Sequence, residues 1–248
     1  MLVIANGTYK SGSSWLFWLL VGMTGYPFPP AEFARKGWNG TGVDPKKLHK
    51  FLDQINRTNG NYVFKAHIFL KHDLIASHPH VRIMHITRDI RDALVSAFYY
   101  ERMKGQCRSD NFEDYYWRHG RKRARYIISY NRLWDTVPNK FLTTYEALHG
   151  NFEAEVHRMA AHLGITLKDG DMERLRKASD IDSLREKYAE TDSDQKFFRK
   201  GVIGDWQSHF NPAMADDLAK IDDGTRGFPN ALQRLRLKLL SKIRPGMD

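Results

Sequence analysis

The chain has 248 residues, a formal net charge of +10 and a single cysteine, Cys107. One cysteine excludes an intrachain disulfide, and the longest apolar run, residues 15–23, falls short of the roughly 20 residues that span a bilayer. The cysteine count fits a reducing compartment, and the first predicted strand leaves no room for a signal peptide, so we expect a cytoplasmic protein. The excess of Lys and Arg favours a polyanionic ligand or surface, but it does not choose among nucleotides, nucleic acids, sulfated or phosphorylated substrates and anionic lipids.

Strand-like and helix-like segments alternate along the chain. Short apolar runs predict strands at residues 3–7, 61–67, 81–88 and 140–145. Helical patterns predict helices at residues 13–23, 44–57, 89–103, 111–134 and 151–164, with Asp44 as N-cap of the second helix and a loop at residues 31–43. This alternation predicts a single three-layer α/β domain over residues 1–248, with a central, mostly parallel sheet flanked by helices.

Four polar residues fall at or just past the predicted strand ends: Lys10, His67, Arg88 and Tyr145. Ligands of open parallel sheets bind beyond the carboxyl ends of the strands. We therefore expect these four side chains to line one edge of the sheet.

The first strand leads into the stretch TYKSGSSW, residues 8–15, where a helix begins. Backbone N–H groups at a helix N-terminus, a lysine and several hydroxyls all favour a bound phosphate. The Walker A pattern GxxxxGK[ST] is absent, because the lysine precedes the glycine. The stretch predicts an anion-binding turn without a standard ATP loop, and an ordinary strand-to-helix turn is the alternative.

Two further segments carry basic residues beside flexible or hydroxyl-bearing positions. In RDIRDALVS, residues 88–96, Ser96 can point back toward Arg88 because helical side chains lean toward the helix N-terminus. In RKGVIGDW, residues 199–206, two cations precede a glycine with an approachable backbone. Taken singly, the first could be a surface arginine with a packing serine, and the second a solvated basic loop.

Together and in this order, the three segments resemble the motifs of the PAPS-dependent sulfotransferase family, cytosolic type, where PAPS is 3′-phosphoadenosine 5′-phosphosulfate. YKSGSSW is similar to the family's phosphosulfate loop YPKSGTTW, and RKGVIGDW is similar to RKGxxGDW. RDIRDALVS resembles the family's 3′-phosphate motif, with Asp92 at the expected position. The resemblance implies a P-loop-like phosphosulfate-binding turn and a metal-independent enzyme that transfers the sulfuryl group of PAPS to an acceptor hydroxyl.

The resemblance also implies a role for each matching residue. Lys10 would hold the phosphosulfate and neutralise the leaving phosphate, and further donors would come from Ser11, Gly12, Ser13 and Ser14. The 3′-phosphate would be bound by Arg88, Ser96, Arg199, Lys200 and Gly201. The adenine would be contacted by Trp15, Tyr145 and Ser179.

The family's general base lies in a strand-end KTH, and this chain has KAH at residues 65–67. Lys65 and His67 are two residues apart on a predicted strand, so both side chains face the same side. With an ordinary pKa of about 6.5, His67 can take the acceptor's proton. Lys65 can stabilise charge on the transferring group. Without the resemblance, His67 is one of 11 histidines.

The sequence departs from the family pattern at two points. Tyr9 replaces the proline before the loop lysine, and no dimerisation motif follows Phe210, so the oligomeric state stays open. Aromatic residues are expected to wall an acceptor pocket, with lid packing as the alternative: Tyr26, Phe28, Phe33, Trp38, Phe112, Tyr115, Tyr116 and Trp117. The acceptor itself, whether a small molecule, a saccharide or a lipid, is not encoded in any motif.

Three features lie outside these motifs. The histidines at positions 72, 78, 80 and 85 lack the spacing of a zinc site, so we expect no metal. The basic run at residues 118–125 fits a solvated helix face better than a nucleic-acid or anionic-substrate site. The basic, amphipathic tail at residues 231–246 fits packing on the domain, with weak contact to an anionic membrane surface as the alternative.

Two other functions remain as alternatives to sulfuryl transfer. A P-loop-like, nucleotide-dependent kinase would explain the opening turn but would require the missing Gly-Lys-Ser/Thr. A non-catalytic, basic nucleic-acid-binding module would explain the charge but would leave the three ordered motifs unexplained.

Overall fold

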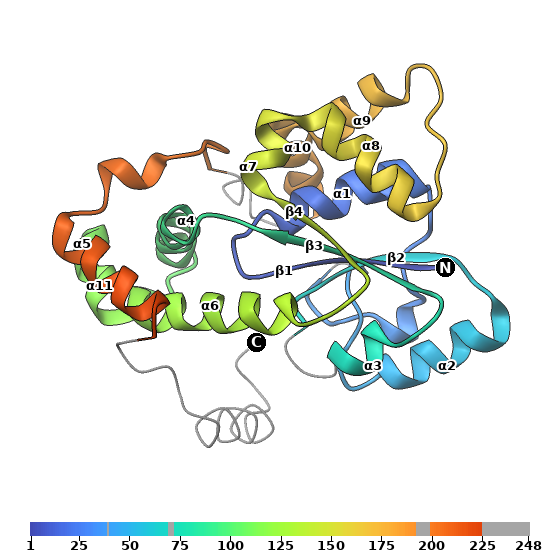
Figure 1. Cartoon of the computed structure of the whole chain (residues 1–248), viewed down its shortest axis with the longest axis horizontal. Helices are drawn as coiled ribbons and strands as arrows, with labels where there is room; N and C mark the ends of the chain where they lie inside the picture. The colour runs from blue at the N-terminus through green and yellow to red at the C-terminus, as the bar shows by residue number, and fades with distance from the viewer. Residues whose placement is uncertain (39, 69–71, 192–198, 225–248) are drawn as a thin grey trace.

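The computed structural model describes residues 1–38, 40–68, 72–191 and 199–224 (Figure 1). Its sheet has four parallel strands in the order β2-β1-β3-β4. The strands are β1 (Leu2–Gly7), β2 (Tyr62–Ala66), β3 (Val81–Thr87) and β4 (Lys140–Thr144). Since all four run parallel, their carboxyl ends meet at one edge, as the alternation of strands and helices predicts.

Helices cover both faces of the sheet (Figure 1). One face carries α1 (Ser13–Thr24), α7 (Tyr145–Gly150), α8 (Phe152–Leu163), α9 (Asp171–Ser179) and α10 (Ile181–Thr191). The other carries α2 (Leu48–Thr58), α3 (His72–Ala76) and α6 (Arg121–Asp135). The predicted α/β class with helices flanking a parallel sheet is therefore confirmed.

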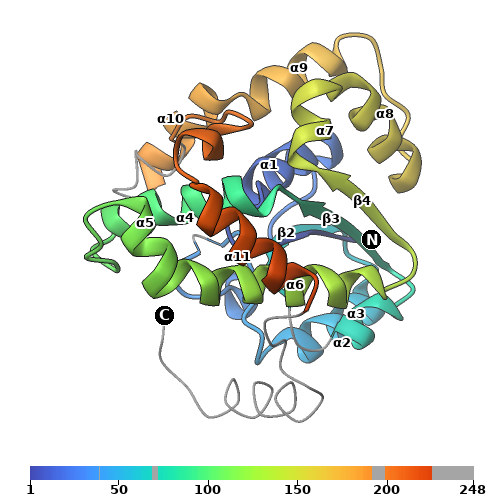
Figure 2. The same cartoon turned by 60° about the vertical axis from the view of Figure 1, so that its left-hand side comes forward.

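The remaining helices extend the layer built on α6. They are α4 (Ile90–Met103), α5 (Phe112–Tyr115) and α11 (Pro212–Asp222), and Figure 2 shows α11 lying across α6. Short turns of 3-10 helix occur at η1 (Ala31–Phe33) and η3 (Asp205–Ser208).

Strand β1 is buried along its whole length and divides the core into two layers. Val3 and Ala5 pack toward the α1 side with Leu20, whereas Leu2 and Ile4 belong to the cluster on the opposite face. This alternation follows from the two-residue period of a strand. A central strand apolar on both faces is typical of a parallel sheet covered by helices.

Two predicted helices differ from the observed ones. Asp44 does not cap α2, because its carboxylate accepts from the Lys46 N–H and closes a separate turn, and the helix begins only at Leu48. The predicted helix at 111–134 is broken into α5, a π-helical turn η2 (Tyr116–Gly120) and α6. This wider turn accompanies a buried contact in which the Tyr116 hydroxyl donates to the Asp217 carboxylate at 3.0 Å.

Gly7 ends β1 at a point with no room for a side chain. A Cβ there would lie 2.5 Å from Ser11 Oγ and 2.8 Å from the Ile86 carbonyl oxygen. We predict that Gly7→Ala lowers the free energy of unfolding by about 1–3 kcal/mol, the usual cost of overpacking a tight site. Urea unfolding should show this as a lower midpoint.

Gly150→Ala is the matched control, because a Cβ at Gly150 meets no atom within 4 Å. An unchanged unfolding midpoint for Gly7→Ala would contradict the tight packing inferred at the end of β1.

Candidate active site

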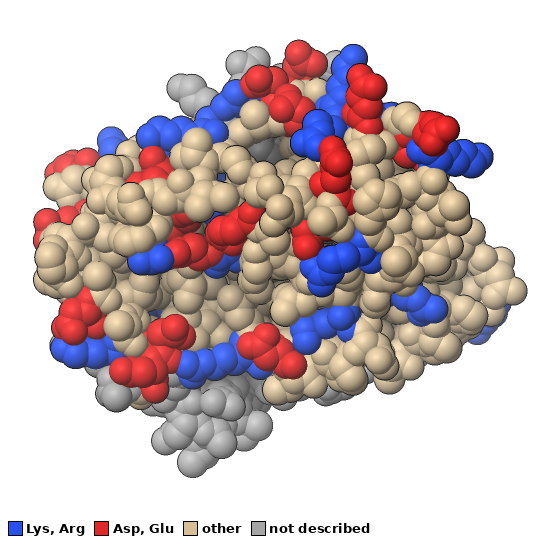
Figure 3. All heavy atoms as spheres, turned by 45° about the horizontal axis from the view of Figure 1, so that its top comes forward, with Lys and Arg blue, Asp and Glu red and all other residues tan. Residues whose placement is uncertain are grey.

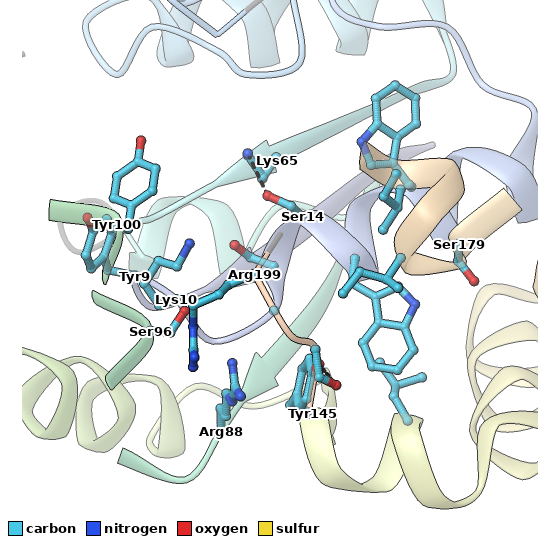
Figure 4. A pocket seen from close by; sticks show the side chains of 18 of the residues that line it. Tyr9, Lys10, Ser14, Lys65, Arg88, Ser96, Tyr100, Tyr145, Ser179 and Arg199 are labelled. Atoms are coloured by element: carbon cyan, nitrogen blue, oxygen red, sulfur yellow. Dashed lines mark hydrogen bonds between the residues drawn. The ribbon is translucent and has the colours of Figure 1, made fainter. Parts of the chain in front are cut away.

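A cavity of about 1210 Å³ opens at the carboxyl ends of the strands. The predicted residues that line it are Lys10, Gly12, Ser13, Ser14, Trp15, Lys65, His67, Arg88, Ser96, Tyr145, Ser179, Arg199, Lys200 and Gly201. Figure 4 shows ten of the lining side chains with labels, most of them from this set. Segments from the first to the last described part of the chain thus converge on one cavity, and Ser11 alone among the predicted residues does not line it.

The turn after β1 has a strained backbone that exposes the start of α1. Lys10 has φ of 63° and Gly12 has φ of 94°, both in the left-handed region. A Cβ on Gly12 would lie 2.7 Å from the Tyr145 ring, so this position requires glycine. No side chain caps the helix at Gly12. The N-terminus of α1 therefore presents backbone N–H groups to the cavity, where they favour an anion.

Ser11 has a different role from its neighbours in this turn. It is fully buried, and its hydroxyl donates to the Thr8 carbonyl at 2.8 Å. The Ser11 hydroxyl therefore closes the turn internally, and Ser11 does not line the cavity. In the sequence Ser11 looks no different from Ser13 and Ser14, so only the folded structure shows that Ser13 and Ser14 line the cavity and Ser11 does not.

Arg88 lies over the Tyr145 ring, with its guanidinium carbon 4.1 Å from the ring centroid. One guanidinium nitrogen donates to the Val202 carbonyl at 3.0 Å, whereas the buried Nε has no hydrogen-bond partner among the described residues. A buried donor without a partner is costly. A bound anion beside Arg88 would satisfy it.

Arg199 and Lys200 both form ion pairs with Asp205, from the same loop. Burial raises the pKa of Asp205, but hydrogen bonds from Lys200 and Arg199 outweigh it and hold the pKa at about 2. Gly201 has φ of 70° and its carbonyl accepts from the Tyr145 hydroxyl at 2.7 Å. The loop is thus fixed to the sheet edge with its cations facing the cavity.

Asp92 anchors this loop, a role that the sequence analysis did not assign. It is 2% exposed, and its carboxylate accepts from the N–H groups of Gly204 at 2.8 Å and Trp206 at 3.0 Å. Two motifs far apart in sequence are therefore joined by one buried carboxylate. The only sequence signal was the position of Asp92 within RDIRDALVS.

His67 follows β2, and its Nδ1 lies 2.6 Å from the Gly7 carbonyl oxygen. Because a carbonyl can only accept, Nδ1 carries the hydrogen and Nε2 is left with a lone pair. Burial lowers the pKa of His67 to about 4, with nearby Lys65 and Arg35 also lowering it and the Gly7 hydrogen bond opposing them. At neutral pH the ring is an uncharged base.

The backbone beside His67 is held by a buried polar network. Asn6 Oδ1 accepts from the Ile68 N–H at 3.2 Å and from the Tyr130 hydroxyl at 2.5 Å. The Trp134 indole N–H donates to the Ile68 carbonyl at 2.7 Å. These bonds fix the chain at the residue after the imidazole.

Lys65 lies opposite the turn at the start of α1. Its ammonium donates to the Ser14 hydroxyl at 3.1 Å, drawn as a dashed line in Figure 4, and lies 5.0 Å from the Trp38 ring centroid. The predicted pairing of Lys65 and His67 on one side of β2 thus brings both to the same cavity.

Two aromatic groups line the end of the cavity nearest α9. Trp15 packs edge to face on Tyr145, with ring centroids 5.2 Å apart. Ser179 borders the same cavity, but its hydroxyl already donates to the Leu175 carbonyl at 2.8 Å.

The predicted acceptor-pocket aromatics divide into two groups. Phe28 and Trp38 line the cavity. The others do not: Tyr26 packs against the α1 cluster and Trp117 is 40% exposed. The remaining four are buried in the core, namely Phe33, Phe112, Tyr115 and Tyr116. The four aromatics of residues 112–117 expected at the cavity wall thus do not line it, and three of them, Phe112, Tyr115 and Tyr116, pack between α4, α6 and α11 instead. Besides the predicted Tyr145, three tyrosines that were not predicted line the cavity: Tyr9, Tyr100 and Tyr126.

Three arginines of the basic run at residues 118–125 form ion pairs with acidic side chains. Arg118 pairs with Asp114, Arg121 with Asp217 and Arg123 with Glu101. On the face shown in Figure 3, Lys and Arg are interspersed with Asp and Glu. The tail at 231–246 lies outside the described residues.

Within the described part of the chain, no cluster of His, Cys, Asp and Glu could hold a metal ion. No helix of the described residues is long and apolar enough to cross a membrane.

Comparison with known proteins identifies the family. A family model described as "Sulfotransferase domain" matches residues 3–226, so the chain belongs to the sulfotransferase family. It is similar to Sulfotransferase 2A1 of Homo sapiens, with 26% identity over 155 residues that cover 56% of this chain and 54% of the relative. Cytosolic sulfotransferase 11 of Arabidopsis thaliana is 24% identical over 201 residues, covering 69% of this chain and 55% of the relative. The chain thus spans about half the length of these curated relatives.

Solved structures share the fold. Mouse sulfotransferase SULT7A1 complexed with PAP superposes with a TM-score of 0.68 at 17% identity, covering 98% of this chain and 88% of that chain. Retinol dehydratase in complex with androsterone and inactive cofactor PAP gives a TM-score of 0.65 at 17% identity, covering 92% of this chain and 82% of that chain.

Removing the Asp92 carboxylate should loosen the loop that it holds. Asp92→Ala leaves the half-buried N–H groups of Gly204 and Trp206 without this acceptor, at a cost of at most about 1–3 kcal/mol each. We predict faster cleavage by trypsin after Arg199 and Lys200, measured by mass spectrometry under native conditions.

The control is Asp169→Ala, because Asp169 is an exposed residue on the turn before α9. If Asp92→Ala were cleaved at the wild-type rate, Asp92 would not be the anchor of the loop.

Proposed function

We propose that this protein is a PAPS-dependent sulfotransferase that transfers the sulfuryl group to an acceptor hydroxyl, with His67 as general base. The observation that carries the proposal is the convergence of Lys10, Arg88 and His67 on one cavity with the 199–201 loop. Two cationic ends, one beside α1 and one beside Arg88, match a nucleotide with phosphates at both its 5′ and 3′ positions.

The residues present fit such a ligand. Eight cations line the cavity against one acid among its described lining residues, Asp180. The start of α1, which no described side chain caps, offers N–H donors, and within the described chain the Arg88 Nε lacks a partner. Trp15 and Tyr145 supply aromatic surface for an adenine between the two ends.

The chemistry follows from the positions of three side chains. His67 Nε2 takes the proton of the acceptor hydroxyl as that oxygen forms a bond to sulfur. The bond between sulfur and the 5′-phosphate oxygen breaks, and its electron pair leaves with the phosphate. Lys10 and Lys65 offset the negative charge on the leaving oxygen and the transferring group.

The family relatives support this proposal. The curated relatives are named sulfotransferases, and two solved neighbours were crystallised with PAP, the product that this reaction would release. Four relatives are named cytosolic sulfotransferases, which supports a cytosolic location.

The alternatives account for less of the site. A kinase would need the Gly-Lys-Ser/Thr that the turn at residues 8–14 lacks. Nucleic-acid binding would leave the half-buried His67 and its place among the cations of the cavity without a purpose.

Ligand binding separates these functions directly. At 100 times its Kd, a ligand stabilises the folded state by about 2.7 kcal/mol, which is roughly 5–11 °C in Tm for a domain of this size. We predict such a shift with adenosine 3′,5′-bisphosphate in a thermal denaturation assay. A shift with ATP or single-stranded DNA and none with the bisphosphate would refute the proposal.

The pH dependence of kcat/KM tests His67. The low pKa of His67 keeps the ring neutral above about pH 4, so kcat/KM should stay flat from about pH 7.5 to 5.5 and fall only near pH 4. His67→Ala should lower kcat/KM by about 10²- to 10⁴-fold while the bisphosphate still raises the Tm.

His80→Ala serves as the control, since His80 lies on an exposed turn away from the cavity. Near-normal turnover by His67→Ala, or an acid limb near pH 6.5 in the wild type, would assign the base to another group.

A further inference from the structure

The cavity holds one cation that the proposed function leaves without a role. Its lining cations are Lys10, Arg35, Lys65, Arg88, Arg123, Arg176, Arg199 and Lys200. Five of these belong to the proposed nucleotide and transfer site. Arg123 pairs with Glu101 at 2.6 Å and Arg176 with Glu153 at 2.9 Å, which leaves Arg35.

Arg35 is held in place by its backbone and by one aromatic ring. Its N–H donates to the Gly42 carbonyl at 2.9 Å, next to the antiparallel bridge between Ala34 and Val43. Its half-buried guanidinium lies 4.4 Å from the Trp38 ring centroid. Among the described residues it has no carboxylate partner, and it retains donors for an anion.

Trp38 places Arg35 at the acceptor end of the cavity. The His67 ring packs edge to face on the same indole at 5.5 Å, and the Lys65 ammonium lies 5.0 Å from it. Arg35 also acts on the pKa of His67 and, with Arg123, on that of Tyr126, whose pKa is raised by burial. Arg35 therefore lies near the proposed base.

We propose that the acceptor bears, besides the hydroxyl that is sulfated, an anionic group that pairs with Arg35. The inference rests on the proposed function and deepens it by naming the acceptor class. An apolar body fits between the rings that line this part of the cavity, including Phe28, Trp38 and Tyr126. A carboxylate or a sulfonate-like group suits a guanidinium equally, because both offer paired oxygens.

No other group in the cavity opposes such an acceptor. The one acidic lining residue of the described chain, Asp180, directly follows Ser179 at the end of α9. A neutral acceptor would leave the Arg35 donors facing apolar substrate, which costs binding energy. The site therefore favours an anionic acceptor and disfavours a neutral one.

The test compares matched acid and amide acceptors. The carboxylate pairs are para-hydroxyphenylacetate with its amide and omega-hydroxydecanoate with its amide, and para-hydroxybenzenesulfonate with its sulfonamide tests the sulfonate. We expect the wild type to prefer at least one acid over its neutral partner by about 10- to 100-fold in kcat/KM, the range for a hydrogen-bonded charge pair. Which pair shows the preference distinguishes the two anions.

Variants of Arg35 test whether this residue causes the preference for the acid. Arg35→Gln should bring the acid-to-amide ratio close to one, and Arg35→Lys should restore part of it. Any effect of Arg35 on the His67 base is common to both members of a pair and cancels in the ratio. Lys36→Gln is the matched control, because it removes the same charge from the adjacent exposed residue and should leave the ratio unchanged.

A second readout works without turnover. In the presence of saturating adenosine 3′,5′-bisphosphate, an acid should raise the Tm more than its amide in the wild type and not in Arg35→Gln. Equal use and equal binding of acids and amides by the wild type, or a ratio unaffected by Arg35→Gln, would overturn the proposal. Failure of the proposed function itself is distinct, because the bisphosphate would then give no shift.

Discussion

The parallel pairing of β1 with both β2 and β3 is the constraint on which the rest of the site depends. Asn6 pairs with Ala66 on one side and Gly7 with Ile86 on the other, so His67 and Arg88 emerge at the same edge as the opening turn. The Gly7 carbonyl then accepts from His67, which joins the turn to the proposed base. A shift of one residue in this register would turn these side chains to the other face.

Charge balance explains how so many cations share one cavity. Asp205 pairs with Arg199 and Lys200, Glu101 with Arg123, and Asp92 ties the basic loop to α4 through backbone N–H groups. These acids hold the cations in position from outside the cavity without entering it. The cavity is therefore positively charged, which suits a highly charged nucleotide. Arg35 is then available to the acceptor.

Much of the fold and site could be predicted from the sequence, because strands and strand ends are local patterns. The polar residues after the four strands were placed correctly for this reason. Contacts across the chain could not be read: Asp92 reaches Gly204 over 112 positions, and Ser11 turns inward while Ser13 and Ser14 face the cavity. Arg35 lies in a loop without a periodic pattern, so its place in the cavity could not be predicted from nearby residues. The π-helical turn before α6 accompanies a tertiary contact, so the local sequence does not predict it either.

The most direct test of this account is mass spectrometry of the products formed from PAPS and the anionic hydroxy acceptors. The account predicts one sulfate ester and one adenosine 3′,5′-bisphosphate per turnover, with no phosphorylated product when ATP replaces PAPS. A phosphate ester formed from ATP, or no transfer to any acceptor by a protein that binds the bisphosphate, would contradict it.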